Sequence, residues 1–334
     1  MRAIWRSEKN SSIMKNWKTI IVLLLVVLTI VGLLQRLIPS EVFPIPVLYP
    51  RIQGLYESCS PSRGDLCLDR LKQMAATGFK LVINYDQFSG TVQQEIAYAK
   101  QAQALGMKVI WAMNDPVFWN GTDLLSNYND FASGCECSDN QGFIRFFLGL
   151  AKVQPATWGY YIGDEVQKQD HARVKAFADI VKQLDPTHPR LFVSGEDVST
   201  MGANLIPFVD TADVIGADIY PISTSESIDA VGKIAHAIQL IANRYHKQSM
   251  LVLQAFSWAQ YAHATWVCSP FPSCAHFPTK DEMRQMRDLA TKNMHLQFIL
   301  WYSYFDILNS DQPYIHLIDL DSATSSTLNA RDNR

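Results

Sequence analysis

The chain has 334 residues, of which 48% are hydrophobic, and a formal net charge of −3 at pH 7. This length fits two average domains or one α/β barrel, and the hydrophobic fraction suffices for a large core. Because the charge is near neutral and the body of the chain carries no basic stripe, nucleic acid is excluded as an expected partner.

The first 50 residues are predicted to lie outside the folded domain. Residues 19–34 carry no charge and are bounded by Lys18 and by Gln35 and Arg36, with Leu37 and Ile38 extending the segment beyond them. This is near the minimum length for a bilayer span. Five Lys or Arg residues precede the run against the single Glu8, so the positive-inside rule predicts a cytoplasmic N-terminus over residues 1–18, a transmembrane signal-anchor over residues 19–38 and export of the rest. A cleaved signal peptide is the alternative and would make the protein secreted, but no small-x-small site follows the run. Four prolines in residues 39–50 predict a linker.

The cysteines agree with an oxidising compartment. All six lie in loop-like stretches rich in Ser, Pro, Gly or Asp, at Cys59, Cys67, Cys135, Cys137, Cys268 and Cys274. The first two and the last two are each predicted to form a disulfide that closes a short loop. Cys135 and Cys137 stand too close in sequence to pair easily with each other, so their partners stay open. A zinc site is the alternative, but no His has ligand spacing beside these cysteines, and no metal or cofactor is expected.

From residue 51 onward, strand-like runs alternate with amphipathic segments. The predicted strands cover residues 52–56, 80–85, 108–113, 157–166, 190–194, 214–220, 250–255 and 297–302. The predicted helices cover residues 65–77, 91–105, 141–153, 170–184, 227–245 and 280–294, with a short one near residue 204. Eight such units predict a closed (β/α)8 TIM barrel over residues 51–325, followed by a disordered tail over residues 326–334. A doubly wound open sheet is the alternative, but no glycine-rich phosphate loop follows the first strand.

The fourth predicted strand ends on two adjacent acids, Asp164 and Glu165. Unpaired buried carboxylates cost several kcal/mol, so packing alone does not explain them, whereas catalytic groups gather at the carboxyl ends of barrel strands. Alternation places Tyr161 and Glu165 on one side of the strand and Asp164 on the other, and it predicts that Glu165 faces the barrel axis. The alternative is that the two acids cap the next helix.

Other predicted strand ends also combine acids with aromatic and amide side chains, and six of the eight end in carboxylates. The candidate catalytic residues are Glu165, Asp164, Asp218 and Glu196. The candidate substrate-binding residues are Asn84, Tyr85, Asn114, Trp119, Tyr161, Tyr220, Gln254, Trp258, Trp301 and Tyr302. Acids ringed by Trp and Tyr suit glycoside hydrolysis, in which one carboxyl protonates the leaving oxygen and a second attacks the sugar or activates water.

The chain resembles the clan A type of glycoside hydrolase barrel. Residues 158–165 match the signature of strand 4 in that clan, with Asp164 where the best-known families carry Asn before the Glu. Residues 299–302 resemble its strand 8, and residues 185–189 resemble its turn into strand 5. The resemblance implies that Glu165 is the acid/base. It also places the nucleophile at the end of strand 7, where this chain has Gln254, and an amide cannot serve as a carboxylate nucleophile.

Three explanations of this departure stay open. Asp218 or Glu196 supplies the second carboxylate of an inverting reaction, an acetamido group of the substrate acts with Asp164 orienting it, or the barrel binds glycan without cleaving it. Asp218 is preferred because it shares a strand face with Tyr220, although a structural hydrogen bond is the alternative for it. The sequence therefore predicts a membrane-anchored, extracytoplasmic barrel that hydrolyses glycosidic bonds, with a non-catalytic glycan-binding barrel as the alternative.

Overall fold

The computed structural model describes residues 52–195, 200–292 and 295–308. The predicted cytoplasmic segment 1–18, anchor 19–38, linker 39–50 and tail 326–334 lie outside the described residues, and so does Glu196. In the described part of the chain, no helix is both long enough and apolar enough to cross a membrane.

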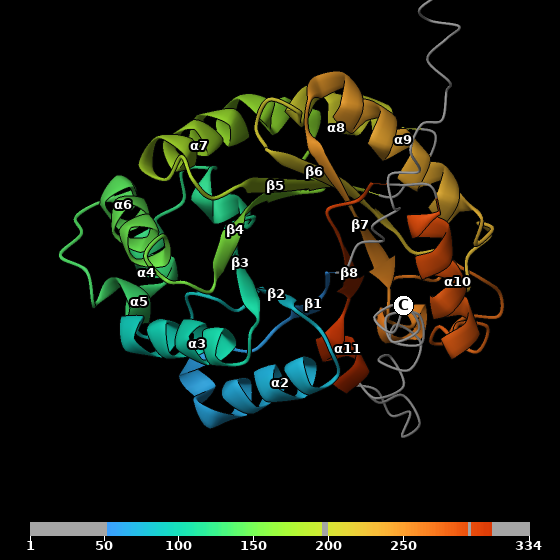
Figure 1. Cartoon of the computed structure of the whole chain (residues 1–334), viewed down its shortest axis with the longest axis horizontal. Helices are drawn as coiled ribbons and strands as arrows, with labels where there is room; N and C mark the ends of the chain where they lie inside the picture. Colours follow the sequence, from blue (N-terminus) through green and yellow to red (C-terminus); the bar gives the residue numbers. More distant parts are fainter. Residues whose placement is uncertain (1–51, 196–199, 293–294, 309–334) are drawn as a thin grey trace, which may run out of the picture. The chain divides into compact units, whose positions relative to one another are not determined.

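Eight parallel strands pair in sequential order and close into a barrel (Figure 1). They are β1 (Gln53–Glu57), β2 (Leu81–Asn84), β3 (Lys108–Ala112), β4 (Thr157–Asp164), β5 (Arg190–Ser194), β6 (Val214–Ile219), β7 (Gln248–Gln254) and β8 (Phe298–Tyr302). The barrel closes where β8 pairs with β1, with Gln53 opposite Ile299 and Leu55 opposite Trp301. This topology confirms the predicted (β/α)8 barrel.

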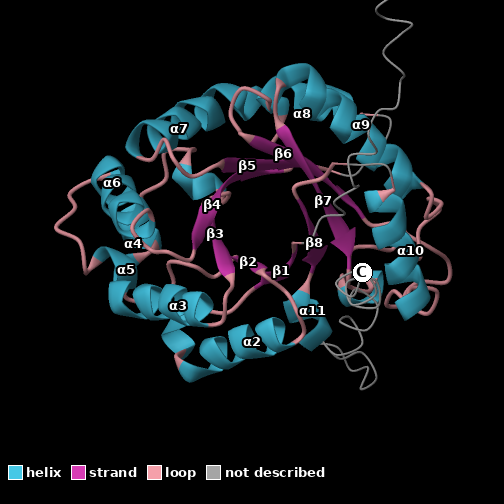
Figure 2. Cartoon of the chain, viewed as in Figure 1, coloured by secondary structure: helices cyan, strands magenta, loops and turns pink. Residues whose placement is uncertain are grey.

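Helices surround the strands in a ring (Figure 2). They are α2 (Asp65–Ala76), α3 (Val92–Ala104), α4 (Leu124–Asn127), α5 (Asn129–Ala132), α6 (Asn140–Ala151), α7 (His171–Leu184), α8 (Met201–Leu205), α9 (Ala230–Tyr245), α10 (Lys280–Thr291) and α11 (Tyr304–Leu308). Short 3-10 turns are η1 (Pro61–Arg63), η2 (Pro116–Phe118), η3 (Lys168–Asp170), η4 (Ile206–Phe208) and η5 (Trp258–Gln260). The predicted helices agree to within a few residues, whereas α4 and α5 lie in a segment that was predicted as loop.

Alternation along the strands divides the core into two parts. One set of side chains fills the inside of the barrel: Tyr56, Leu81, Ile83, Ile110, Ala112, Tyr161, Leu191, Val193, Val214, Met250, Val252, Phe298 and Leu300. The other set packs outward against the helices and includes Leu55, Val82, Trp111 and Tyr160. Because the inside is filled by side chains, the space for a ligand lies at the carboxyl ends of the strands.

Disulfides Cys59–Cys67 and Cys268–Cys274 form as predicted. Cys135 and Cys137 lie side by side, with their Cα atoms 5.2 Å apart.

Candidate active site

Five tyrosines line the carboxyl ends of the strands, and we call them the tyrosine cluster: Tyr56, Tyr85, Tyr161, Tyr220 and Tyr302. The ring of Tyr56 lies 5.3 Å from that of Tyr85, 6.1 Å from that of Tyr161 and 5.3 Å from that of Tyr302. Tyr220 joins from β6 with its ring 5.9 Å from that of Tyr302. The cluster therefore collects side chains from β1, β2, β4, β6 and β8 around one opening.

Asp164 reaches this cluster from β4. The Tyr85 hydroxyl donates a hydrogen bond of 3.0 Å to its Oδ2 atom. Burial raises the pKa of Asp164, and the hydroxyls of Tyr161 and Tyr85 oppose that rise because they stabilise the ionised form. The carboxyl of Asp164 is thus removed from water, and phenol hydroxyls stabilise its charge.

The predicted alternation along β4 is wrong. Tyr161 packs inside the barrel and Ile162 packs outside it, as alternation requires, but the pairing of β4 with β5 shifts register between Tyr161 and Gly163. This irregularity changes the phase of the strand, so Asp164 lies on the same side as Tyr161. Asp164, rather than Glu165, is the acid that contacts the tyrosines inside the barrel.

Glu165 stands at the rim, directly after β4. Its φ is +48°, a left-handed conformation that is uncommon for residues other than glycine. Its backbone N–H donates to the Val193 carbonyl at 3.0 Å, and its Oε1 atom would lie 3.0 Å from a Cβ added at Gly195. The carboxylate therefore lies beside the end of β5 and is exposed. Partial burial and then the charge of Asp164 raise the pKa of Glu165.

Asp218 approaches the same opening from β6 and is only 6% exposed. Its charge contributes to raising the pKa of Tyr220 after burial, and it contributes in the same way at Tyr56 and Tyr85. Asp164 acts on these three tyrosines too, so both aspartates face the tyrosine cluster. Glu196 follows β5 outside the described residues and is not placed.

Aromatic residues extend the opening on the β7 side. Trp258 on η5 lies 4.9 Å from Phe256 and 6.3 Å from Tyr220, measured between ring centroids. Tyr261 donates a hydrogen bond of 2.9 Å from its hydroxyl to Asp306. Phe256, Tyr261 and Asp306 were not among the predicted site residues, because the loops after β7 and β8 show no periodicity that places them.

Two further candidates lie after β3. Asn114 is partly exposed, and its amide makes no hydrogen bond to another described residue. Trp119 instead packs against the outer core.

Three of the predicted substrate-binding residues are buried and make contacts within the protein. Asn84 is fully buried and accepts a hydrogen bond from the Cys59 N–H at 3.0 Å while donating to the Cys59 carbonyl at 2.7 Å. Trp301 packs in the outer core and donates to Gln53 Oε1 at 2.9 Å. Gln254 is also fully buried.

Gln254 uses its whole amide on the backbone. Its Oε1 atom accepts from the Ile222 N–H at 2.8 Å, and its Nε2 atom donates to the carbonyls of Ile222 at 3.3 Å and Phe256 at 3.1 Å. These bonds connect the end of β7 to the loop after β6. The residue at the expected nucleophile position therefore braces two loops and is not presented to a ligand.

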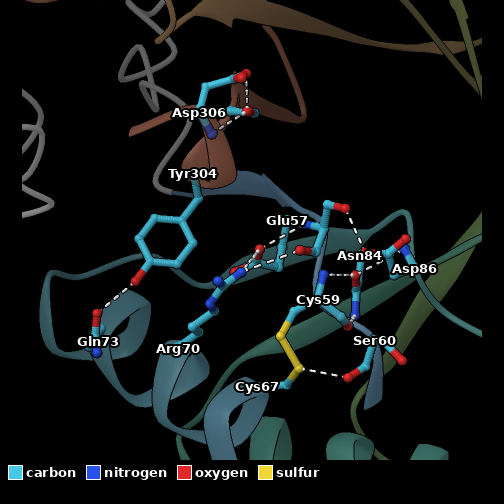
Figure 3. Close-up of polar contacts among 12 residues, drawn as sticks. Glu57, Cys59, Ser60, Cys67, Arg70, Gln73, Asn84, Asp86, Tyr304 and Asp306 are labelled. Carbon is cyan, nitrogen blue, oxygen red and sulfur yellow. Dashed lines mark hydrogen bonds and ion pairs between the residues drawn. A yellow bond between two sulfur atoms is a disulfide. The ribbon is translucent and has the colours of Figure 1, made fainter. Parts of the chain in front are cut away.

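A buried ion pair connects the end of β1 to α2 (Figure 3). Arg70 of α2 donates to Glu57 Oε1 at 3.0 Å, and the Ser58 N–H donates to the same oxygen at 2.7 Å. Burial raises the pKa of Glu57 to about 7 despite Arg70. In the same view the Tyr304 hydroxyl donates to Gln73 at 2.7 Å, which connects α11 to α2. Glu57 points away from the opening because it follows Tyr56, whose side chain points into the barrel. The sequence did not single out Glu57 or its partner Arg70, because the first strand is weakly marked.

A metal centre finds no support in the described residues, since no group of three or more His, Cys, Asp or Glu side chains among them could hold an ion. The titratable side chains described at the opening are carboxyls and phenols. Among the described residues, no Lys or Arg lies within ion-pair distance of Asp164 or Glu165.

Neither a family model nor a curated protein matches this sequence. Solved structures do match in fold. A proposed alpha-L-fucosidase from Bacteroides thetaiotaomicron aligns with 85% of this chain and 94% of its own, with 11% identity and a TM-score of 0.54. A glucosidase from Croceicoccus marinus aligns with 76% of this chain and 60% of its own, with 13% identity and a TM-score of 0.53. A GH2 beta-galacturonidase from Eisenbergiella tayi aligns with 76% and 44%, with 12% identity and a TM-score of 0.51.

These likenesses confirm, at the level of the fold, the resemblance to glycoside hydrolase barrels. The chain spans nearly the whole of the first protein but less than two thirds of the other two. Shared fold alone does not carry function, which depends on the residues of the site.

Proposed function

We propose that this protein hydrolyses glycosidic bonds, with carboxyl groups at the mouth of the barrel as acid and base. One observation carries the proposal: Asp164, Glu165 and Asp218 come from two different strands to one opening lined by tyrosines. The names printed for the similar structures, a fucosidase, a glucosidase and a galacturonidase, are those of sugar-cleaving enzymes and add support.

Glu165 is the proposed general acid. A general acid must hold its proton near the working pH, and burial together with the charge of Asp164 raises the pKa of Glu165. Its left-handed backbone costs about 1–3 kcal/mol, and such strain is concentrated at functional sites. The rim position leaves its carboxyl accessible to a leaving group.

Asp218 is the proposed second carboxylate, with Glu196 as the other candidate. In an inverting reaction the base activates water from the opposite face of the sugar, so the two carboxyls stand about 6.5–9.5 Å apart. Asp218 belongs to β6 and Glu165 follows β4, and two carboxyls from different strands can be separated in this way. Asp164 is proposed to tune Glu165 through its charge and to hold the substrate together with Tyr85.

The remaining candidates are proposed to bind the sugar. The hydroxyls of Tyr220 and Tyr302 can exchange hydrogen bonds with sugar hydroxyls, and the ring of Trp258 offers an apolar face, whereas Tyr161 is fully buried. Disulfides Cys59–Cys67 and Cys268–Cys274 support a location outside the cytoplasm. Attachment to the membrane through residues 19–38 belongs to the same proposal.

The test is release of reducing sugar by the purified full chain over a panel of polysaccharides and aryl glycosides. Glu165→Gln and Asp218→Asn should each lower the rate by about 10²–10⁴-fold, the range for a lost acid or base, while near-ultraviolet circular dichroism stays that of the parent. Glu226→Gln changes an exposed acid on the loop before α9 and serves as the matched control. The anomeric form of the first product then separates an inverting from a retaining reaction.

A glycan-binding barrel without catalysis is the second candidate, and one observation favours it. The residue at the strand-7 nucleophile position is an amide that is fully engaged with the backbone. If the parent binds glycans and releases no sugar from any member of the panel, this second function replaces the first. Equal activity of parent and Glu165→Gln would instead show that another residue is the acid.

A further inference from the structure

Trp266 is the most exposed large hydrophobic residue in the described chain, at 68%. It lies in the long loop between β7 and α10. Its ring centroid is 5.4 Å from that of Trp258, and the two ring planes are inclined by 63°. The two indoles are therefore in contact, and Trp266 presents its surface to solvent.

A continuous line of aromatic rings leads from Trp266 to the carboxyls of the mouth. Trp258 follows it, and the ring of Tyr220 lies 6.3 Å from that of Trp258. The charge of Asp218 acts on Tyr220, so the line ends beside the proposed second carboxylate. Single exposed hydrophobic residues are normal on protein surfaces, whereas an exposed aromatic that continues a site is a feature of a binding surface.

The loop around Trp266 is held in place at several points. Val267 is buried next to it, and the disulfide Cys268–Cys274 closes the following turn. Further along, the His276 N–H donates to Ser223 Oγ at 3.0 Å, which attaches the loop to the segment after β6. A binding residue on a loop that is already ordered loses little conformational entropy when a ligand arrives.

The chemistry of this segment indicates the kind of ligand. Residues 251–279 contain no Asp, Glu, Lys or Arg. A surface without charged side chains does not recognise an anionic polymer or an anionic lipid surface through ion pairs. It does suit a neutral molecule with apolar C–H faces and many hydroxyls, because indole rings cover the former and Ser, Thr and His side chains bond the latter.

We propose that Trp266 forms an outer subsite for a neutral oligosaccharide whose inner end occupies the carboxyl-lined mouth. The inference rests on the proposed function and extends it to substrate length and charge. Because Trp258 and Tyr220 lie between Trp266 and Asp218, a single sugar at the carboxyls does not reach Trp266, while a longer chain does. The protein thus prefers neutral chains to monosaccharides and to acidic chains.

The experiment measures binding by calorimetry. The full chain carrying Glu165→Gln is titrated with neutral gluco-, xylo- and manno-oligosaccharides from monosaccharide to hexasaccharide, and with acidic oligogalacturonides. In this background, Trp266→Ala should weaken binding of the longest neutral ligand by about threefold to tenfold, as the loss of one aromatic contact predicts, and leave monosaccharide binding unchanged. Trp266→Tyr retains a ring and should restore most of the affinity. Leu240→Ala, which changes an exposed residue of α9, is the control and should have no effect.

The outcomes separate the two proposals. If affinity for neutral chains rises with length in the parent and Trp266→Ala removes that rise, the subsite is supported. If parent and Trp266→Ala show the same dependence on length, or if acidic chains bind best, the subsite is overturned while the proposed function stands. If the Glu165→Gln protein binds no sugar and the unmutated protein cleaves none, the proposed function itself fails, and the subsite fails with it.

Discussion

The hydroxyl of Tyr85 donates a 3.0 Å hydrogen bond to Asp164, although 79 positions separate the two residues in sequence. The bond joins the end of β2 to the end of β4 across the opening of the barrel. It also stabilises the ionised form of a carboxyl whose pKa burial raises. Tyr85, together with Tyr161, therefore favours the charged form of Asp164.

Removal of that hydroxyl should alter the pH dependence of the proposed glycosidase activity. In Tyr85→Phe the pKa of Asp164 should rise further, because the ionised form loses a hydrogen bond. If activity requires ionised Asp164, the acidic limb of the kcat/KM profile moves to higher pH by the same amount. Tyr245→Phe on α9 is the control, and an unchanged profile in Tyr85→Phe would show that Asp164 is not the group that titrates.

A side chain at position 195 should impair the proposed role of Glu165. A Cβ at position 195 would lie 3.0 Å from Glu165 Oε1, so Gly195→Ala must displace the carboxyl by a few tenths of an ångström. We expect kcat to fall by about tenfold to a hundredfold with little change in thermal stability, because small displacements of a reacting group are costly. Gly202→Ala on α8 meets no atom within 4 Å and is the matched control. Wild-type kcat in Gly195→Ala would argue against Glu165 as the acid.

Glu95 should make the protein less stable as pH rises. It is fully buried on α3, it accepts a hydrogen bond from the Phe88 N–H at 2.9 Å, and burial raises its pKa from 4.5 to about 8. The folded state thus holds this proton more tightly than the unfolded state does, so the stabilisation is complete below pH 4.5 and is lost progressively up to about pH 8. Within this window the free energy of unfolding should fall by about 1.4 kcal/mol per pH unit for one such group.

The measurement is urea unfolding at a series of pH values. Glu95→Gln keeps a neutral side chain of the same shape, so its free energy of unfolding should depend less on pH than that of the parent. Glu57, with its pKa raised to about 7, adds a slope of the same sign that remains in the variant. Parallel curves for parent and Glu95→Gln would contradict a protonated Glu95 in the folded state.

Gly159 should tolerate no side chain. A Cβ there would stand 2.3 Å from the Pro189 carbonyl oxygen, which accepts the Tyr160 N–H at 2.9 Å in the pairing of β4 with β5. Gly159→Ala should therefore lower the free energy of unfolding by about 3 kcal/mol or more, because backbone atoms must separate. Gly149→Ala, in α6 with no atom within 4 Å, should be neutral or should stabilise by up to about 1 kcal/mol. Thermal unfolding of the two variants beside the parent checks both values.

The fold was largely predictable because each strand is a short apolar run and most helices have an amphipathic repeat. β5 runs from Arg190 to Ser194, as predicted, because a turn with two prolines precedes it and a glycine follows it. The barrel needs only this order of elements, since parallel strands with helical crossovers close in sequence order. The short α4 and α5 were missed because four residues show no period.

The site was less predictable because which face a strand residue occupies depends on pairing with the neighbouring strand. The register shift between Tyr161 and Gly163 reverses the phase of β4, and nothing in the sequence of β4 alone announces it. Asn84 and Trp301 likewise stand near strand ends but turn toward backbone and core partners that are distant in sequence. The residue types at the strand ends thus indicate where a site lies. Which of these side chains face the site is decided by the packing of the whole barrel.

The tyrosine cluster has an electrostatic consequence. Burial first, and then the charges of Asp164 and Asp218, keep the pKa values of Tyr56, Tyr85, Tyr161 and Tyr220 well above their ordinary range, so these hydroxyls stay neutral at physiological pH. Only the carboxyls then change the potential of the mouth, which becomes more negative as pH rises. Such a surface stabilises positive charge, including the cationic character of a glycosyl transition state. A basic imino sugar should therefore bind better than a neutral sugar of the same shape, and its advantage should increase as the carboxyls ionise.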